Sequence, residues 1–360
     1  MYLENINSPA DVKAVGIDKL DILVGEVRKH LLQKLSDHGG HIGPNLGMVE
    51  ATVALHYVFN SPIDKMVFDV SHQSYAHKML TGRKDAFLNP AEYDEVSGYT
   101  EPSESEHDQF VVGHTSTSVS LACGLAKGRD LKGGKENVIA VIGDGSLSGG
   151  EALEGLDMAA ELDTNIIIVV NDNQMSIAEN HGGLYKNLQL LRETNGGAQC
   201  NLFKAMGLDY VYVGEGNNVK ALVEAFQKVK DTTRPVVVHI NTVKGKGYKF
   251  AEEQKERFHW GFPFVIETGE TKKEYQFGPD FGVHTAQMLL DEMQKDPAVV
   301  ALTAGTPGIW GWNAEMRQKA GKQFVDVGIA EETAVAMSSA MAKRGAKPVF
   351  GVHSSFIQRT

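Results

Sequence analysis

Two clusters of polar residues follow neighbouring apolar runs in the middle of the chain. The run 138–142 leads into Gly-Asp-Gly-Ser at 143–146, and the run 166–170 leads into Asn-Asp-Asn at 171–173. If both runs are parallel strands, these clusters meet beyond the carboxyl edge of one sheet, where ligands of open α/β sheets bind. The spacing therefore predicts a polar site at that edge.

The chemistry expected of Asp144 and Asn173, one from each cluster, is binding of a divalent cation. A carboxylate, an amide oxygen and a backbone carbonyl just after it suit Mg²⁺, which keeps its other positions for water and diphosphate oxygens. Gly143 and Gly145 let the backbone approach such a diphosphate, and the following helix offers N–H groups to it. The simpler interpretation is a strand-to-helix turn with a capping aspartate, but the second cluster favours the metal site.

The elements that must position these residues alternate between strands and helices, which predicts an α/β fold with a parallel sheet. A helix at 18–35 comes first, because its leucines and valines recur at helical spacing before a Gly-Gly pair. The predicted strands are 66–68, 138–142, 166–170, 211–213 and 236–240, and the helices between them are at about 117–128, 150–162 and 218–230.

Residues 250–280 break this alternation with charges, aromatic residues, prolines and glycines. We therefore expect a first domain at 1–265, a linker at 266–280 and a second α/β domain at 281–360. The second series comprises a helix at 281–294, a strand at 299–303, a helix at 331–343 and a strand at 348–352. Two strands are too few for a parallel sheet covered on both faces, so the second domain is expected to be incomplete, in a fragment or a subunit of a split protein.

The composition limits the possible partners and compartment. The net charge of −11, without a long basic run, argues against nucleic acid or an anionic membrane as the main partner. Cys123 and Cys200 lie far apart without ligand-like spacing, which indicates free thiols in a reducing compartment, so we expect a cytoplasmic protein. No targeting segment or apolar stretch of membrane-spanning length is present in the sequence.

Gly-Asp-Gly at 143–145, followed by the asparagine at 173, resembles the thiamine diphosphate signature of transketolases and deoxyxylulose-phosphate synthases. Other segments resemble the synthase versions, in family order over nearly the whole chain. These segments are 40–47, 69–78, 113–118, 173–177, 244–248, 258–259, 326–331 and 354–359. The resemblance implies a first domain that binds the diphosphate and Mg²⁺, and a second domain that binds the pyrimidine ring.

The same resemblance implies a role for each matching residue. Mg²⁺ would be bound by Asp144, Asn173 and the backbone of Met175. The thiamine diphosphate would be lined by His72, Gly113, His114, Thr115, Gly145, Ser146, Asn173, Tyr248 and Glu331. Two of these have simpler interpretations, since His114 could cap a helix and Tyr248 could be core packing.

Glu331 would hydrogen-bond the aminopyrimidine ring and promote the tautomer that deprotonates the thiazolium carbon. That role requires a carboxyl group able to hold a proton near neutral pH, and partial burial raises a glutamate pKa in that direction. Without the resemblance, a glutamate in a first helical turn would be interpreted as compensating the helix dipole. His41 and His259 match histidines that face the reacting ketone and are the other catalytic candidates.

The chain departs from the family pattern mainly on the substrate side. The segment between Leu184 and Leu202 is short, where the synthases carry a long excursion. Glu-Gly-Asn-Asn at 215–218 replaces Asp-Gly-His-Asp, Thr333 replaces a histidine, and Ser71 replaces a glycine. No phosphate-binding arginine can be assigned from the resemblance.

The activity implied is decarboxylation of pyruvate on thiamine diphosphate and condensation with D-glyceraldehyde 3-phosphate, a transferase reaction that supplies isoprenoid, thiamine and pyridoxal biosynthesis. Two alternatives stay open at this point. One is ketol transfer between sugar phosphates, as in transketolases, and the other is a cofactor-binding subunit that is inactive without a C-terminal half. The family also implies a homodimer, with no nucleic acid or membrane partner.

Overall fold

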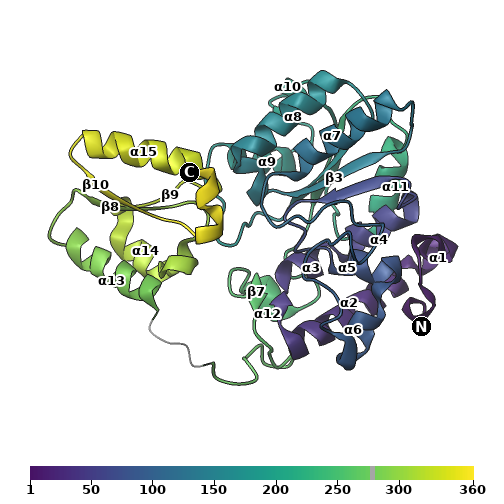
Figure 1. The fold of residues 1–360 in the computed structure, drawn as a ribbon, viewed down its shortest axis with the longest axis horizontal. Coiled ribbons are helices and arrows are strands. Elements are labelled where there is room, and N and C mark those ends of the chain that lie inside the picture. Colours follow the sequence, from purple (N-terminus) through teal and green to yellow (C-terminus); the bar gives the residue numbers. More distant parts are fainter. Residues whose placement is uncertain (276–279) are drawn as a thin grey trace.

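The computed structural model describes residues 1–275 and 280–360, which form two α/β units, each built on a parallel sheet (Figure 1). The larger sheet has the order β2-β3-β4-β6-β5, and all its neighbouring strands are parallel. Its strands are β2 (Lys65–Phe68), β3 (Val138–Gly143), β4 (Ile167–Asp172), β5 (Asp209–Val213) and β6 (Val236–Asn241). The predicted α/β fold class and the five predicted strands of this sheet are therefore confirmed.

The central strands are apolar along their length because helices cover both faces of the sheet. Ile139 and Val141 of β3 point into one hydrophobic core, and Val138, Ala140 and Ile142 point into the other. This alternation is the two-residue period of an extended chain. Packing on both faces fixes the register, so the polar clusters at the ends of β3 and β4 lie side by side.

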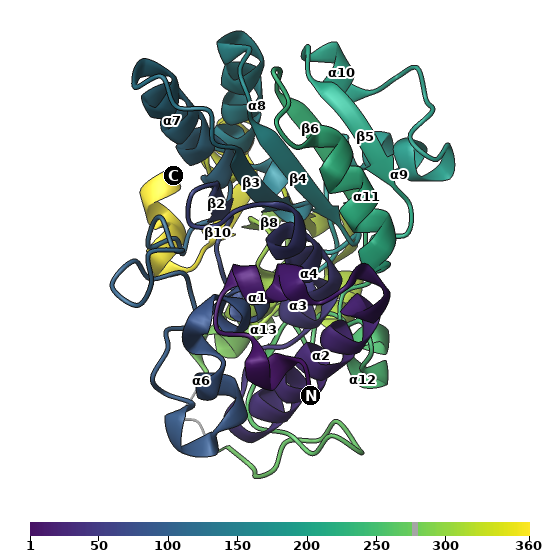
Figure 2. The same cartoon turned by 90° about the vertical axis from the view of Figure 1, so that its right-hand side faces the viewer.

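The first core is covered by α2 (Leu20–His38), α4 (Val49–Val58) and α11 (Val219–Val229), and the second by α7 (Ser118–Leu131) and α8 (Gly150–Leu162). Figure 2 shows these two groups of helices on either side of the sheet. Shorter elements complete the first unit: α1 (Pro9–Ala14), α3 (Gly43–Gly47), α5 (Tyr75–Lys78), α6 (Asp85–Leu88), α9 (Leu184–Glu193), α10 (Leu202–Ala205), α12 (Lys249–Glu253) and an antiparallel pair of β1 (Gly40–His41) and β7 (Trp260–Gly261).

The second unit contains a three-stranded parallel sheet of order β10-β8-β9. Its strands are β8 (Val299–Thr303), β9 (Phe324–Asp326) and β10 (Lys347–Gly351), and its helices are α13 (Phe281–Met293), α14 (Ala314–Ala320) and α15 (Glu331–Lys343). Trp312 is fully buried in its small core. The sequence prediction missed α14 and β9. The strand β9 has only three residues, all half-buried, so its sequence shows no alternation of apolar and polar residues.

Part of the predicted linker 266–280, namely residues 276–279, lies outside the described residues. The division of the chain at 265 and 281 stays a prediction. Within the part of the chain that the structure describes, no helix has both the length and the apolar character needed to cross a membrane.

Candidate active site

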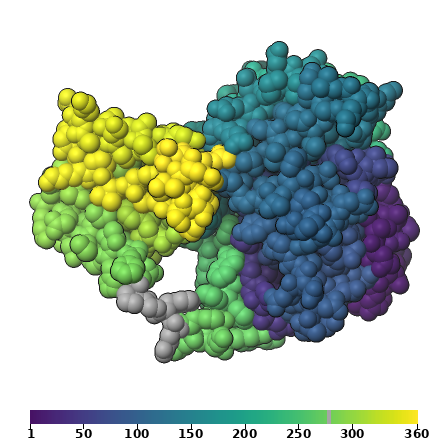
Figure 3. Space-filling view, viewed as in Figure 1, coloured from purple at the N-terminus to yellow at the C-terminus, as the bar shows by residue number. Residues whose placement is uncertain are grey.

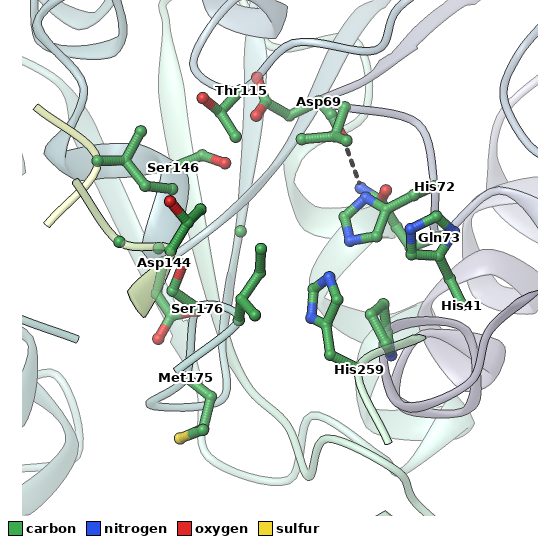
Figure 4. A pocket seen from close by; sticks show the side chains of 18 of the residues that line it. His41, Asp69, His72, Gln73, Thr115, Asp144, Ser146, Met175, Ser176 and His259 are labelled. Carbon is green, nitrogen blue, oxygen red and sulfur yellow. Dashed lines mark hydrogen bonds between the residues drawn. The ribbon is translucent and has the colours of Figure 1, made fainter. Parts of the chain in front are cut away.

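A cavity with about 1030 Å³ of empty space, part of it open to solvent, lies beyond the carboxyl ends of β3 and β4. The first unit contributes most of its lining, and the second contributes residues that include Gly305, Ile329, Glu331 and Phe356. Figure 4 shows Asp144 and Ser146 on one side of the cavity and three histidines on the other. The cavity therefore brings together residues from both units.

Asp144 and Asn173 line this cavity together, as the strand order predicted. The Asp144 carboxylate is 1% exposed and accepts one hydrogen bond of 2.8 Å from the Asn180 side chain. Burial and the nearby Asp172 carboxylate raise the pKa of Asp144 to about 7, while Lys244 opposes the shift. A cation bound beside Asp144 would favour its charged form.

Asp172 is fully buried and is not among the residues that line the cavity. Its carboxylate forms an ion pair with Arg192 and lies 2.8 Å from His239 Nε2, and the Tyr210 hydroxyl lies 2.8 Å from the other nitrogen of that imidazole. These contacts fix the end of β4. Asp144 therefore remains the carboxylate that the two clusters present to the cavity.

The donors at this edge fit Mg²⁺. Among the described residues, no group of three or more His, Cys, Asp or Glu side chains could bind a metal. The edge instead offers the Asp144 carboxylate, the Asn173 amide and the Met175 backbone, and all three residues line the cavity. Such a small oxygen set suits a hard cation that keeps ligand positions for water and diphosphate oxygens.

Backbone groups surround the adjacent part of the cavity, which Gly113, Thr115, Gly145 and Ser146 line. A Cβ atom on Gly145 would come within 2.9 Å of the Ser176 Cβ, so a side chain does not fit there without a shift of that loop. The absence of side chains at 113 and 145 leaves room for a diphosphate to approach the backbone.

The loop before α7 is held by Asp69, whose two carboxylate oxygens accept the N–H groups of Ser116 and Ser118 at 2.8 and 2.9 Å. This bonding fixes the N-terminus of α7 beside Thr115, where the helix dipole favours an anion. Asp69 is thus a positioning residue of the predicted diphosphate site that the sequence prediction did not assign.

Three histidine rings form the opposite wall. The ring centroids of His41 and His72 are 4.8 Å apart, those of His72 and His259 5.3 Å, and those of His41 and His259 5.8 Å. Burial lowers the pKa of His41 to about 4, and it holds the pKa values of His72 and His259 well below the ordinary range. All three imidazoles are therefore neutral at pH 7, and each can donate at one nitrogen and accept at the other.

Lys244 is a cavity residue that the sequence prediction missed. It is 2% exposed, its ammonium donates to the carbonyl of Ser176, and its Nζ lies 3.0 Å from His259 Nδ1. Burial lowers the pKa of Lys244 to about 7. Lys244 belongs to the segment 244–248, one of the segments that resemble the synthases, and this position could have predicted it as a site residue. Only Tyr248 was assigned from that segment.

Glu331 enters the cavity from the second unit as the first residue of α15. It is 3% exposed, and no other described side chain hydrogen-bonds its carboxyl group. Burial is the main cause that raises its pKa above the ordinary value. This environment matches the proton-holding role implied by the resemblance.

Two predicted cofactor residues do not line the cavity. Tyr248 is buried among Phe250, Phe258 and Phe264, and its hydroxyl donates to the carbonyl of Ile266 at 3.1 Å. The simpler interpretation, core packing, describes this tyrosine because the turn before α12 directs its ring into the aromatic cluster.

The His114 side chain likewise packs outside the cavity lining, with its ring centroid 5.3 Å from that of Phe356. Its neighbours Gly113 and Thr115 line the cavity, whereas the imidazole packs against Phe356 of the second unit.

Direct bonds join the two units next to the cavity. The Ser148 hydroxyl accepts the N–H of Ile329 at 3.1 Å, and the Arg359 guanidinium lies 2.6 Å from a carboxylate oxygen of Glu151. Figure 3 shows the last residues of the chain in contact with the larger unit. These bonds hold Glu331 over the carboxyl edge of the first sheet.

Comparison with known families agrees with this geometry. The family model described as 1-deoxy-D-xylulose-5-phosphate synthase matches residues 3–200. The chain belongs to this family. A second model, described as the thiamine diphosphate binding domain of transketolase, matches residues 116–319, a range that includes both polar clusters.

Curated members of the family match almost the whole chain. The 1-deoxy-D-xylulose-5-phosphate synthase of Caldanaerobacter subterraneus is 42% identical over 99% of this chain and 63% of its own length. That of Halothermothrix orenii is 39% identical over 99% of this chain and 61% of its own length. The chain thus spans less than two thirds of these relatives.

Solved structures with the same fold include transketolases. That of Campylobacter jejuni matches with a TM-score of 0.56 and 16% identity over 96% of this chain and 67% of its own chain. A transketolase of Pichia stipitis matches with a TM-score of 0.51 and 14% identity over 93% of this chain and 64% of its own. These similarities confirm the predicted fold class.

Proposed function

We propose that this chain binds thiamine diphosphate with Mg²⁺ and contributes the reaction centre of 1-deoxy-D-xylulose 5-phosphate synthesis. The observation that carries the proposal is that Asp144 and Asn173, from the first unit, and Glu331, from the second, line one cavity. A cofactor with a diphosphate at one end and an aminopyrimidine ring at the other needs these two kinds of partner. Membership of the family supports the same assignment.

In this proposal Asp144, Asn173 and the Met175 carbonyl bind Mg²⁺. Gly113, Thr115, Gly145 and Ser146 surround the diphosphate, and His72 borders the cofactor. When bound, thiamine diphosphate supplies a nucleophilic carbon and an electron sink for making and breaking carbon–carbon bonds next to a carbonyl. The protein orients the reactants and excludes water.

The proposed role of Glu331 is to hold a proton at a ring nitrogen of the aminopyrimidine. Its burial supports this role, because a raised pKa keeps the carboxyl group protonated over a wider pH range than an exposed glutamate. The helix that begins at Glu331 also fixes the position of the carboxyl group.

His41 and His259 are proposed to move protons at the substrate oxygen, since both line the cavity opposite Asp144. Neutral imidazoles suit this task because each ring can donate a proton and accept one. Burial and the Lys244 ammonium together lower the pKa of His259 and keep it neutral. Lys244, whose pKa of about 7 keeps part of it protonated at neutral pH, is proposed to supply a positive charge near the carboxylate of an anionic substrate.

The proposed substrates are pyruvate and D-glyceraldehyde 3-phosphate, and the proposed assembly is a homodimer in the cytoplasm. Family membership supports the substrates and the dimer. The two cysteines are both free, one buried and one exposed, which supports a reducing compartment. Ketol transfer between sugar phosphates and dependence on a separate C-terminal half are alternative outcomes of the experiment that follows.

The experiment measures CO₂ release from pyruvate with and without glyceraldehyde 3-phosphate. The full chain, saturated with thiamine diphosphate and Mg²⁺, is expected to release CO₂ only when both substrates are present. Glu331→Gln is expected to reduce the rate at least about a hundredfold, the size of a general acid–base contribution. Glu332→Gln, at the neighbouring exposed position, is the matched control and is expected to retain the rate.

Turnover with a ketose phosphate donor but none with pyruvate would replace the proposed reaction with ketol transfer. An inactive chain that still binds the cofactor would instead favour the subunit alternative. Equal rates for Glu331→Gln and Glu332→Gln would remove Glu331 from the mechanism.

A further inference from the structure

A second cavity lies on the other side of His41 from the reaction centre. It has about 810 Å³ of empty space, part of it open to solvent. His41 and Tyr99 line both cavities, so these two side chains form the shared wall. The remaining lining comes from the end of α2, from β1, α5 and α6, from the segment 93–99 and from Trp260 of β7.

Lys34 brings a positive charge to the lining of this cavity. The residue is only 5% exposed, yet no described carboxylate forms an ion pair with its ammonium group. Its Nζ donates to the carbonyls of Ala86 and Tyr93, both at 2.9 Å, and lies 4.1 Å from the centroid of the Phe87 ring. An ammonium group has three protons, so these two bonds leave one proton without a hydrogen-bond acceptor, beside the rings of Phe87 and Tyr93.

Buried charges in proteins are normally paired, because transfer of an unpaired ion from water is costly. Burial lowers the pKa of Lys34 only to about 8, so most of the group stays charged at pH 7. The two carbonyls explain how Lys34 joins α2 to α6. The Phe87 and Tyr93 rings add cation–π contacts, but neither they nor the carbonyls neutralise the charge that Lys34 brings to the cavity.

Two phenol groups add neutral donors. Tyr75 and Tyr99 line the cavity, and neither hydroxyl donates a hydrogen bond to another described residue, although the Tyr75 oxygen accepts one from the His41 backbone. Burial raises the pKa of Tyr75 to about 12 and also raises that of Tyr99, so both keep their protons at neutral pH. Together with Lys34 they form a set of donors around one space.

Glycines keep the space around the Tyr75 hydroxyl open. A Cβ atom on Gly40 would lie 3.1 Å from this oxygen, and one on Gly98 would lie 3.3 Å from it. Gly40 also has a φ of +126°, which side chains rarely adopt. Among the described residues, the one carboxylate in the lining is that of the exposed Asp94, which lies 2.6 Å from His38 Nε2.

We propose that this second cavity, lined by Lys34, Tyr75 and Tyr99, binds a phosphate-sized oxyanion. The anion is either free phosphate or the phosphate group of a substrate whose reacting carbon lies beside His41. The second source rests on the proposed function. It would place an anchor for a phosphorylated acceptor within this chain, where the sequence offered no arginine for that purpose.

The test is calorimetric titration of the full chain with inorganic phosphate, performed in the presence of saturating thiamine diphosphate and Mg²⁺ so that the reaction-centre cavity is filled. Saturable binding is expected. Lys34→Met is expected to weaken it at least about tenfold, the usual effect of losing a charged hydrogen-bond donor. Lys29→Met removes the same charge from an exposed position of the same helix and is expected to bind as the wild type does.

Because Lys34→Met leaves two buried carbonyls without a donor, Tyr75→Phe serves as a second variant that keeps the ring and removes only the hydroxyl. It is expected to weaken phosphate binding several-fold. The proposal is overturned if the wild type shows no saturable binding or if both variants bind as tightly as the wild type. The proposal is also overturned if Lys34→Met still binds phosphate without the cofactor and if the cofactor abolishes that binding, because the phosphate then occupies the reaction-centre cavity.

A parallel titration with glyceraldehyde 3-phosphate and with glyceraldehyde identifies the source of the anion. If Lys34→Met weakens binding of inorganic phosphate and of glyceraldehyde 3-phosphate but not of glyceraldehyde, the site holds the phosphate group of a substrate. If it weakens binding of inorganic phosphate but of neither aldehyde, the site holds free phosphate. If the chain fails to bind thiamine diphosphate, the comparison of phosphate binding by Lys34→Met and Lys29→Met, made without the cofactor, still tests whether the phosphate lies at Lys34, so failure of the proposed function is distinguishable from failure of this inference.

Discussion

Ser71 occupies a position where the resemblance of this chain to the synthases predicts a glycine. The structure shows which contacts the serine side chain makes. Its φ is +68°, in the left-handed region that costs a residue with a side chain about 1 kcal/mol relative to glycine. Its hydroxyl donates to the carbonyl of Val112 at 2.8 Å and accepts the N–H of Thr100 at 2.9 Å. The side chain therefore joins the loop before His72 to the segment 100–112.

The energetic consequence can be worked out from these contacts. Each buried hydrogen bond contributes about 1 kcal/mol, and loss of the hydroxyl also leaves the buried N–H of Thr100 without an acceptor. Ser71→Ala loses both bonds and keeps the backbone cost, so we expect it to lower the free energy of unfolding by about 2–3 kcal/mol. Ser71→Gly relieves the backbone cost and is expected to lower it by about 1–2 kcal/mol.

Urea unfolding of the three proteins, followed by circular dichroism, measures these differences. The expected order of stability is wild type, then Ser71→Gly, then Ser71→Ala. A Ser71→Gly variant at least as stable as the wild type would show that the two bonds contribute little. A Ser71→Gly variant less stable than Ser71→Ala would refute the cost assigned to the left-handed backbone.

Other contacts lead to three further predictions. Tyr248→Phe should lower the free energy of unfolding by about 1 kcal/mol in urea denaturation, because the hydrogen bond to Ile266 is lost. Its affinity for thiamine diphosphate, measured by calorimetry, should stay within about twofold of the wild type. A large loss of affinity would show that Tyr248 does contact the cofactor. Lys244→Met should raise the pKa of His259 in an NMR titration, because a nearby positive charge is removed; an unchanged or lower value contradicts the assigned coupling. Asp108→Asn should destabilise the fold by about 3–5 kcal/mol at pH 7, because Arg83 and His77 both lose a buried carboxylate, although Arg83 keeps its ion pair with Glu104. The pKa of Asp108 lies far below its ordinary value in the folded chain, so the stability that its carboxylate contributes is present above about pH 4 and is lost as the pH falls further. A stability difference between the wild type and Asp108→Asn that grows on acidification would contradict this.

The sequence predicted the carboxyl edge of the first sheet well because its physical signal is strong. β3 and β4 are buried on both faces, so their apolar runs are continuous and end where the polar residues begin. Asp144 and Asn173 could therefore be placed together before the structure was known. Glu331 could be placed from the resemblance, but its burial against the first unit could not.

Other features were not predictable because they depend on packing between segments distant in sequence. The direction of the Tyr248 ring depends on aromatic partners outside its own turn, such as Phe264. The partners of Lys34 lie on α6 and in the segment after it, far along the chain from α2. Its sequence spacing places it beside the apolar stripe of α2, where a lysine commonly extends to solvent instead.

The most direct test of the central claim is calorimetric titration of the full chain with thiamine diphosphate in the presence of Mg²⁺. We expect saturable, Mg²⁺-dependent binding that Asp144→Asn weakens at least about tenfold, since a charged metal ligand is lost. Asp157→Asn, at an exposed position of α8, should bind as the wild type does. Absence of binding, or equal affinity of Asp144→Asn and Asp157→Asn, would contradict the assignment of this edge of the sheet as the cofactor site.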